Sequence, residues 1–183
     1  MSEYILNNIQ KAQNGILFSD VFLVILYPNR IPPHLAVSVN GKLFSLDVKG
    51  PSLNKDLNVL LRSIQKNQWE CLLVQLKMPE LFTLEDLRRE ISKITAAYPA
   101  VQAGGVTCLA PIKDFCNSIY QTETSNVNFI FDLLPKLEQQ GILNDCYHLN
   151  MDRYFILGNR FELKTYSMFE INETIHSLNG ILV

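Results

Sequence analysis

Residues 34–48 read HLAVSVNGKLFSLDV, two runs of alternating apolar and polar residues joined by Asn40 and Gly41. Asn-Gly between such runs is the strongest short-range signal for a β-hairpin, because a type I′ turn needs positive φ at both central residues. A two-residue turn places Val39 opposite Lys42. The stretch therefore predicts two antiparallel strands in a defined register.

This register predicts one apolar face and one polar face for the hairpin. By the period of two, the apolar face carries Leu35, Val37, Val39, Phe44, Leu46 and Val48. On the other face, Ala36 lies opposite Ser45, and His34 lies opposite Asp47. Because opposed residues have Cβ atoms about 4.5–5.5 Å apart, we expect the imidazole of His34 and the carboxylate of Asp47 to be neighbours.

The composition is that of a globular protein with one domain, which we place at residues 1–183. This length can bury a sizeable core, and 48% of the residues are hydrophobic while 19% are charged. The net charge of −2 and the scattered basic residues argue against nucleic acid as a partner. The apolar run 16–27 is too short to span a membrane, and the N-terminus does not resemble a secretory signal. We therefore expect no membrane span and a cytoplasmic location.

The cysteines give no sign of a metal site. Cys71, Cys108, Cys116 and Cys146 show neither a CxxC pair nor the spacing of metal ligands. His148 lies two residues after Cys146, but the two further ligands that a zinc site would need are missing from the pattern. We expect reduced thiols, with no metal and no cofactor.

Local patterns predict the elements on either side of the hairpin. We expect a helix over 2–13, a buried strand over 16–27, a helix over 53–66 with Asn54 as its cap, and a strand over 69–77. Three more helices are expected: one opened by a capping box of Thr83 and Asp86, one from Thr107 or Cys108 to Tyr120, and one over 127–140. Pro111 belongs in the first turn of its helix, where its missing N–H costs nothing. The tail has strand-like runs at 154–158 and 161–169 and a helical turn at 171–178.

Cys108 is expected at a helix start, where a thiol would face free backbone N–H groups and the positive end of the helix dipole. Both lower the pKa of the thiol, and the same N–H groups could stabilise an oxyanion. A nearby His would act as general base, oriented by a third polar group. His34, Cys108 and either Asp47 or Ser45 supply that set. Each also has a structural interpretation: a buried cysteine, a histidine at a strand end and a surface carboxylate.

Two segments resemble the circularly permuted papain-like proteins of the NlpC/P60 superfamily. The resemblance is to the branch that includes the lecithin:retinol acyltransferase-like proteins and the YiiX-like hydrolases. PPHLAVSVNGKLFSLDV (32–48) resembles their histidine-bearing hairpin. YPAVQAGGVTCLAPIKDFCNSIY (98–120) resembles their region in which a tyrosine and a loop precede a cysteine that opens a helix. The resemblance covers residues 15–120 and leaves 121–183 as a C-terminal extension of helix and strands.

The resemblance implies an α+β fold, with an antiparallel sheet or partial barrel flanked by helices. It also implies a cysteine hydrolase or acyltransferase acting on an amide, thioester or ester bond, with Cys108 as nucleophile and His34 as base. Thr107 and Ser45 stand where the acyltransferase-like members carry Asn and a second His, with a one-residue shift in the turn. Asp47 and Ser45 therefore both remain candidates for the third catalytic member.

Several points stay open at the level of sequence. The substrate could be a small molecule, a peptide or a lipid-like acyl compound, and the oligomeric state is not indicated. The alternative function is a non-catalytic ligand-binding or protein-binding domain that keeps the fold.

Overall fold

The hairpin forms in the register that its sequence predicts. The computed structural model describes residues 4–12, 19–155 and 158–180. Strands β4 (His34–Val39) and β5 (Lys42–Asp47) are antiparallel, and their paired residues run from Val39–Lys42 to Ala36–Ser45. Asn40 and Gly41 have φ values of 49° and 69°, as a type I′ turn requires.

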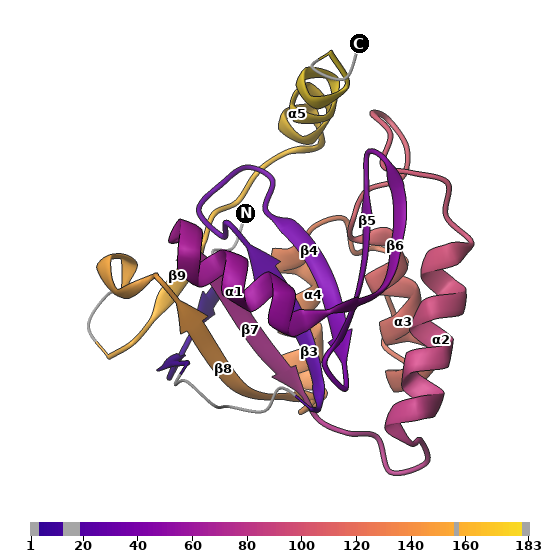
Figure 1. Cartoon of the computed structure of the whole chain (residues 1–183), viewed down its shortest axis with the longest axis vertical. Coiled ribbons are helices and arrows are strands. Elements are labelled where there is room, and N and C mark those ends of the chain that lie inside the picture. The colour runs from indigo at the N-terminus through magenta and orange to yellow at the C-terminus, as the bar shows by residue number, and fades with distance from the viewer. Residues whose placement is uncertain (1–3, 13–18, 156–157, 181–183) are drawn as a thin grey trace.

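This hairpin belongs to a mixed sheet of seven strands (Figure 1). In spatial order the strands are β2 (Gln10–Lys11), β8 (Leu143–Leu149), β7 (Cys71–Leu76), β3 (Val21–Leu26), β4, β5 and β6 (Gly50–Asp56). All neighbours are antiparallel except β2 and β8, which are parallel. A separate two-stranded antiparallel sheet joins β1 (Tyr4–Leu6) to β9 (Phe161–Leu163).

Helices cover both faces of the large sheet. Helix α1 (Leu57–Asn67) lies on one face, and α2 (Leu84–Ala96), α3 (Ala110–Tyr120) and α4 (Ile130–Gln139) lie on the other (Figure 1). A short 3-10 helix, η1 (Asp152–Tyr154), follows β8. Helix α5 (Met168–Gly180) stands at one end of the molecule. The fold is therefore α+β, with a mostly antiparallel sheet flanked by helices on both faces.

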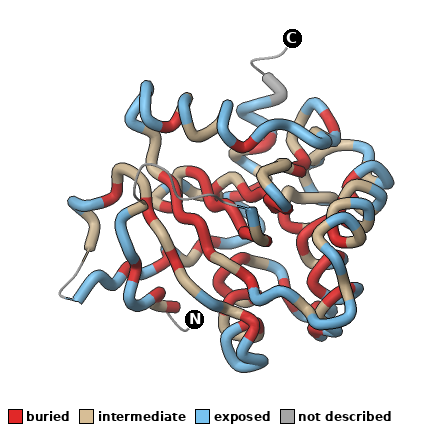
Figure 2. Tube along the Cα trace, turned by 60° about the horizontal axis from the view of Figure 1, so that its bottom comes forward, coloured by how far each residue is buried: buried red, intermediate tan, exposed pale blue. Residues whose placement is uncertain are grey.

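The sheet separates two hydrophobic clusters, and its central strands are buried on both sides (Figure 2). The larger cluster lies under α2, α3 and α4 and includes Phe115 and Leu35. The smaller cluster lies under α1 and includes Ile64 and Ala36. The second face of the hairpin, predicted to be polar, is also buried in β4: Ala36 and Ser38 are both inaccessible, and Ala36 packs in the cluster under α1.

The helix predicted over 2–13 was wrong. The described part of that range contains β1 and β2, whose partners β9 and β8 lie more than 130 residues later. Asn8 between them has a φ of 54°, which interrupts any helix there. Long-range strand pairing thus overrides the local spacing of apolar residues.

The helix predicted over 53–66 begins later than expected. Residues 50–56 form β6, which pairs with β5 at the edge of the sheet, and α1 starts only at Leu57. Its cap is Asp56, whose carboxylate accepts the backbone N–H of Asn58 at 2.8 Å, and not Asn54. Pairing with β5 keeps the first residues of the predicted helix extended.

The predicted helices and strands between residues 69 and 140 agree with the structure in type, whereas the strand-like runs of the tail agree only in part. Thr83 and Asp86 form a full capping box at the start of α2. Strand β3 lies in the range 16–27, of which residues 16–18 are outside the described residues. In the tail, 161–169 contains β9 and then the start of α5, and α5 extends the helical turn predicted at 171–178. The strand-like run predicted at 154–158 begins with Tyr154, which is the last residue of η1 and not part of a strand. Residues 156–157 of this run lie outside the described residues.

Candidate functional site

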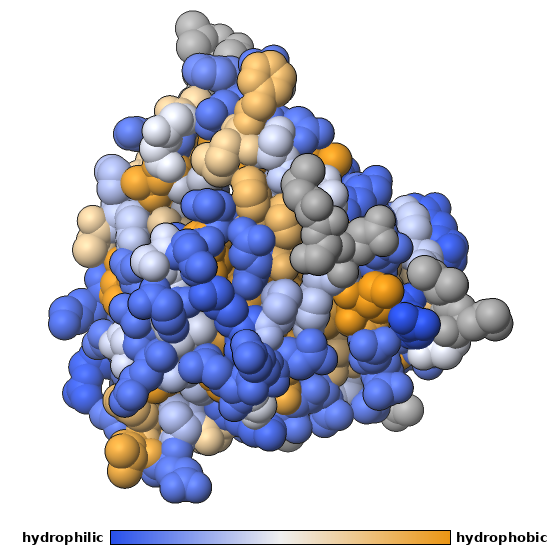
Figure 3. Space-filling model, turned by 180° about the vertical axis from the view of Figure 1, so that it is seen from behind, coloured by the Kyte–Doolittle hydropathy of each residue, from blue (hydrophilic) through white to orange (hydrophobic). Residues whose placement is uncertain are grey.

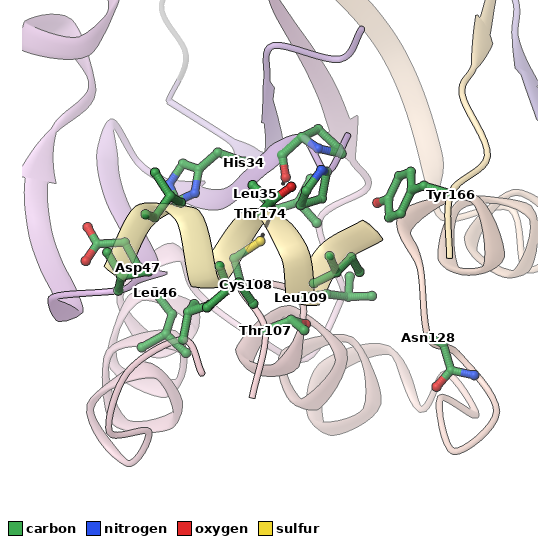
Figure 4. A pocket seen from close by; sticks show the side chains of 17 residues that line it. His34, Leu35, Leu46, Asp47, Thr107, Cys108, Leu109, Asn128, Tyr166 and Thr174 are labelled. Carbon is green, nitrogen blue, oxygen red and sulfur yellow. Dashed lines mark hydrogen bonds between the residues drawn. The ribbon is translucent and has the colours of Figure 1, made fainter. Parts of the chain in front are cut away.

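Cys108 and His34 lie on the wall of one pocket. The pocket has a volume of about 160 Å³ and is formed by the ends of β4 and β5, the turn before α3, and α5 (Figure 4). Most of its lining is apolar: Pro32, Pro33, Leu35, Leu46, Val48, Val101, Leu109, Ile171, Ile175 and Leu178. Cys108, His34 and Asp47 are among its few polar groups. Three of the four residues singled out by sequence therefore meet at one site.

Cys108 lies in the turn just before α3. The helix was expected to start at Thr107 or Cys108, but its first residue is Ala110, and Pro111 is the second. The paired residues of β4 and β5 end at Ala36–Ser45, and the thiol lies against β4 beyond that point. There it donates a hydrogen bond to the backbone carbonyl of Pro33, with an S–O distance of 3.9 Å.

The surroundings of Cys108 raise the pKa of its thiol to about 11, because the group is removed from water. Hydrogen bonding from the backbone of Leu35 and of Cys108 itself acts in the opposite direction but is the smaller effect. The lowered pKa expected from the sequence was therefore wrong. Desolvation outweighs the local N–H groups, and the group is a neutral thiol at neutral pH.

His34 is the first residue of β4 and pairs with Leu26 of β3. Burial lowers the pKa of its imidazole below the usual value of 6.5, and the charge of Asp47 partly opposes this. The ring is consequently neutral at pH 7, the form that can accept a proton. The effect of Asp47 on this pKa indicates that the two side chains are close enough to interact electrostatically.

Asp47 and Ser45, the two candidates for the third member, are placed differently. Asp47 lines the pocket, but one of its carboxylate oxygens accepts the backbone N–H of Lys49 at 2.7 Å. Figure 4 shows this carboxylate directed away from the Cys108 thiol. Ser45 is buried opposite Ala36 and does not line the pocket. Of the two, only Asp47 is in a position to act on His34 within the pocket.

Helix α5 closes the pocket from the other side, which sequence reasoning missed. Ile171, Thr174, Ile175 and Leu178 all line the pocket. The three apolar residues have the spacing i, i+4 and i+7, which is typical of one face of an amphipathic helix. This spacing was the signal in the sequence from which a buried face of α5 could have been predicted. What the spacing could not reveal is where that face packs.

Tyr166, just before α5, is a second pocket residue that was missed. It is buried and packs edge-on against the rings of Phe129 and Phe131, with centroid distances of 5.4 and 5.2 Å. Burial raises the pKa of its hydroxyl, and hydrogen bonding with the backbone of Ile130 opposes this. The residue anchors the chain that leads into α5.

The described residues contain no cluster of three or more His, Cys, Asp or Glu side chains arranged to hold a metal ion. Within the same part of the chain, no helix has both the length and the apolar character needed to cross a bilayer. No protein-family model, curated protein or solved structure matches the chain.

Proposed function

We propose that this protein is a cysteine hydrolase or acyltransferase with a permuted papain-like fold of the NlpC/P60 type, acting on an ester, thioester or amide bond of an apolar acyl group. The observation that carries the proposal is that a thiol and a neutral imidazole, 74 positions apart in the sequence, line the same mostly apolar pocket. The apolar lining favours an acyl chain over a charged or sugar-like substrate.

In the proposed reaction, the Cys108 sulfur attacks the carbonyl carbon of the bound substrate. His34 removes the thiol proton as the sulfur–carbon bond forms, and the backbone N–H of Cys108 stabilises the oxyanion. The imidazolium then gives this proton to the leaving group as the tetrahedral intermediate collapses to an acyl-cysteine. Water, or a second substrate in an acyltransferase, releases the acyl group with His34 again as base. Asp47 stabilises the imidazolium through its charge.

The resting protonation states constrain this mechanism. With the pKa of Cys108 raised and that of His34 lowered, the resting pair is a neutral thiol and a neutral imidazole. Proton transfer therefore accompanies the attack, in contrast to enzymes that hold a preformed thiolate–imidazolium pair.

The direct test is hydrolysis of 4-nitrophenyl esters with acetyl and octanoyl chains. We expect turnover of the octanoyl ester, its loss in Cys108→Ala, and a fall in kcat of at least about 100-fold in His34→Gln. Cys146→Ala and His176→Gln are the matched controls, since neither residue lines the pocket. Full activity in Cys108→Ala would refute the proposed nucleophile.

A second candidate function is a non-catalytic pocket for an apolar ligand. The raised pKa of Cys108 and the bond from its thiol to Pro33 favour it, because both hold the group in an unreactive form. Octanoate binding without ester turnover, unchanged in Cys108→Ala, would support this alternative.

A further inference from the structure

Helix α5 forms one wall of the Cys108 pocket and contributes none of the groups assigned to the chemistry. Its contribution is Ile171, Thr174, Ile175 and Leu178. The thiol, the imidazole and the Asp47 carboxylate come from β4, β5 and the turn before α3. Figure 4 shows α5 running across the pocket alongside the thiol. A movement of α5 would therefore open the pocket and leave the reacting groups in place.

The attachment of α5 to the rest of the protein is shallow. Among residues 168–178, only Ile171 and Ile175 are buried. Two polar contacts add to them. The Thr174 hydroxyl lies 3.2 Å from the carbonyl of Ile31 and 3.0 Å from the Glu170 carbonyl of its own helix, so its proton is shared between the two acceptors. The Asn172 side chain accepts the N–H of Gly104 at 2.8 Å. A helix held by so few buried groups can separate from the domain at a lower cost than global unfolding.

The junction before α5 has the properties of a hinge. Tyr166 is fixed in the aromatic cluster with Phe129 and Phe131. The next residue, Ser167, bonds to the helix that follows: its backbone N–H and its hydroxyl donate to the Glu170 carboxylate at 2.8 and 2.9 Å. Because α5 is capped by its own residues, it can move as a unit without losing its first turn.

The outer side of α5 differs from the side that faces the pocket. On the face seen in Figure 3, apolar side chains gather at the end of the molecule where α5 lies. Met168 and Phe169 of α5 are among the exposed large apolar side chains, and Phe169 is 71% exposed. Phe169 is therefore an apolar residue of α5 that does not line the pocket, and it can serve as a control position on this helix.

We propose that α5 is a lid that gates access to Cys108, closed in this conformation and hinged between Tyr166 and Ser167. The inference rests on the proposed function, since the gated groups are the proposed nucleophile and base. In the closed position the lid narrows the access of water and substrate to the thiol, which is only partly exposed. In the open position it exposes an apolar slot that leads to Cys108 and His34.

The test measures alkylation of Cys108 by iodoacetamide at pH 7.5, followed by intact-protein mass. Cys71, Cys116 and Cys146 are buried in the core, so a single fast adduct reports Cys108. Ile175→Asp places a charge on the inner face of the lid, and Phe169→Asp is the matched control on the outer face. We expect Ile175→Asp to react at least about tenfold faster than the wild type, because each unit by which hydration lowers the thiol pKa raises the thiolate fraction about tenfold.

A second variant covers the case in which Ile175→Asp fails to fold by circular dichroism. Asn172→Ala combined with Thr174→Val removes the two polar contacts and keeps the apolar core, and its alkylation rate should also rise above that of Phe169→Asp. If every folded variant of the inner face is alkylated at the wild-type rate, the proposal that α5 is a lid is wrong. Because alkylation needs no substrate, faster labelling together with absent esterase activity would retain the lid and reject the proposed function.

Discussion

Lowering the pH from 7.5 to 5.5 should destabilise the folded protein through His148. This residue on β8 is 3% exposed, and its Nδ1 atom has no hydrogen-bond partner in the described structure. Its ring packs edge-on against Phe155, with a centroid distance of 4.5 Å. Burial lowers the pKa of the imidazole; Lys11 on the neighbouring strand β2 acts in the same direction, while Asp152 in η1 opposes it. The folded protein therefore holds His148 in its neutral form.

The sign and size of the effect follow from proton linkage. Between the lowered folded pKa and the unfolded value of about 6.5, the unfolded chain binds more protons, so the free energy of unfolding falls as the pH drops. The loss between pH 7.5 and 5.5 has an upper limit of about 1.4 kcal/mol for each such histidine, which is reached when the folded protein keeps the imidazole neutral over the whole range. His34, whose pKa is also lowered, adds a second contribution of up to the same size.

Urea denaturation at pH 7.5, 6.5 and 5.5 measures this loss. His148→Gln should reduce the loss of unfolding free energy between the two end points by up to about 1.4 kcal/mol, whatever its effect on absolute stability. The exposed His176 supplies the control, His176→Gln, which should leave the loss unchanged. Carboxyl groups with lowered pKa, such as Glu70, exchange protons almost entirely below this window. The reasoning is refuted if His148→Gln and the wild type lose equal stability.

Two further predictions concern stability. Thr83→Ala should lower the free energy of unfolding by about 1 kcal/mol, because the Thr83 hydroxyl accepts the N–H of Asp86 at the start of α2; an unchanged urea midpoint would contradict this. Phe115→Ala should cost about 3–5 kcal/mol, since the ring is fully buried between the sheet and its helices. Phe169→Ala at the exposed face of α5 should stay within about 0.5 kcal/mol of the wild type, and a similar loss in both variants would count against the described core.

Features that depend on neighbouring residues could be predicted from the sequence. The register of β4 and β5 follows from the Asn40–Gly41 turn, and the start of α2 follows from the capping box at Thr83. Strands β1, β2 and β6 could not be predicted in this way. Each is held by pairing with another strand, and β1 and β2 have partners in the last third of the chain.

In the candidate site, too, features set by neighbouring residues could be predicted from the sequence and features set by packing could not. The sequence placed a histidine at a strand end and a cysteine near a helix start, and the structure brings both into one pocket. The direction of the shift in the pKa of Cys108 could not be foreseen, because it depends on the packing that removes the thiol from water. The choice between Asp47 and Ser45 likewise could not be made from the sequence, because it depends on the residue pair at which the β4–β5 pairing ends.

The pairing of β2 with β8 and of β1 with β9 has a consequence for how the chain is made on the ribosome. Strands β3 to β7, within residues 21–76, can pair as soon as they have emerged. The segment 4–11 must wait until residues 143–163 are synthesised before it finds its partners. Until then β7 is an open edge of apolar residues, which is the kind of surface that invites pairing with other chains. A nascent chain stalled before residue 143 should therefore depend on chaperones to stay in solution.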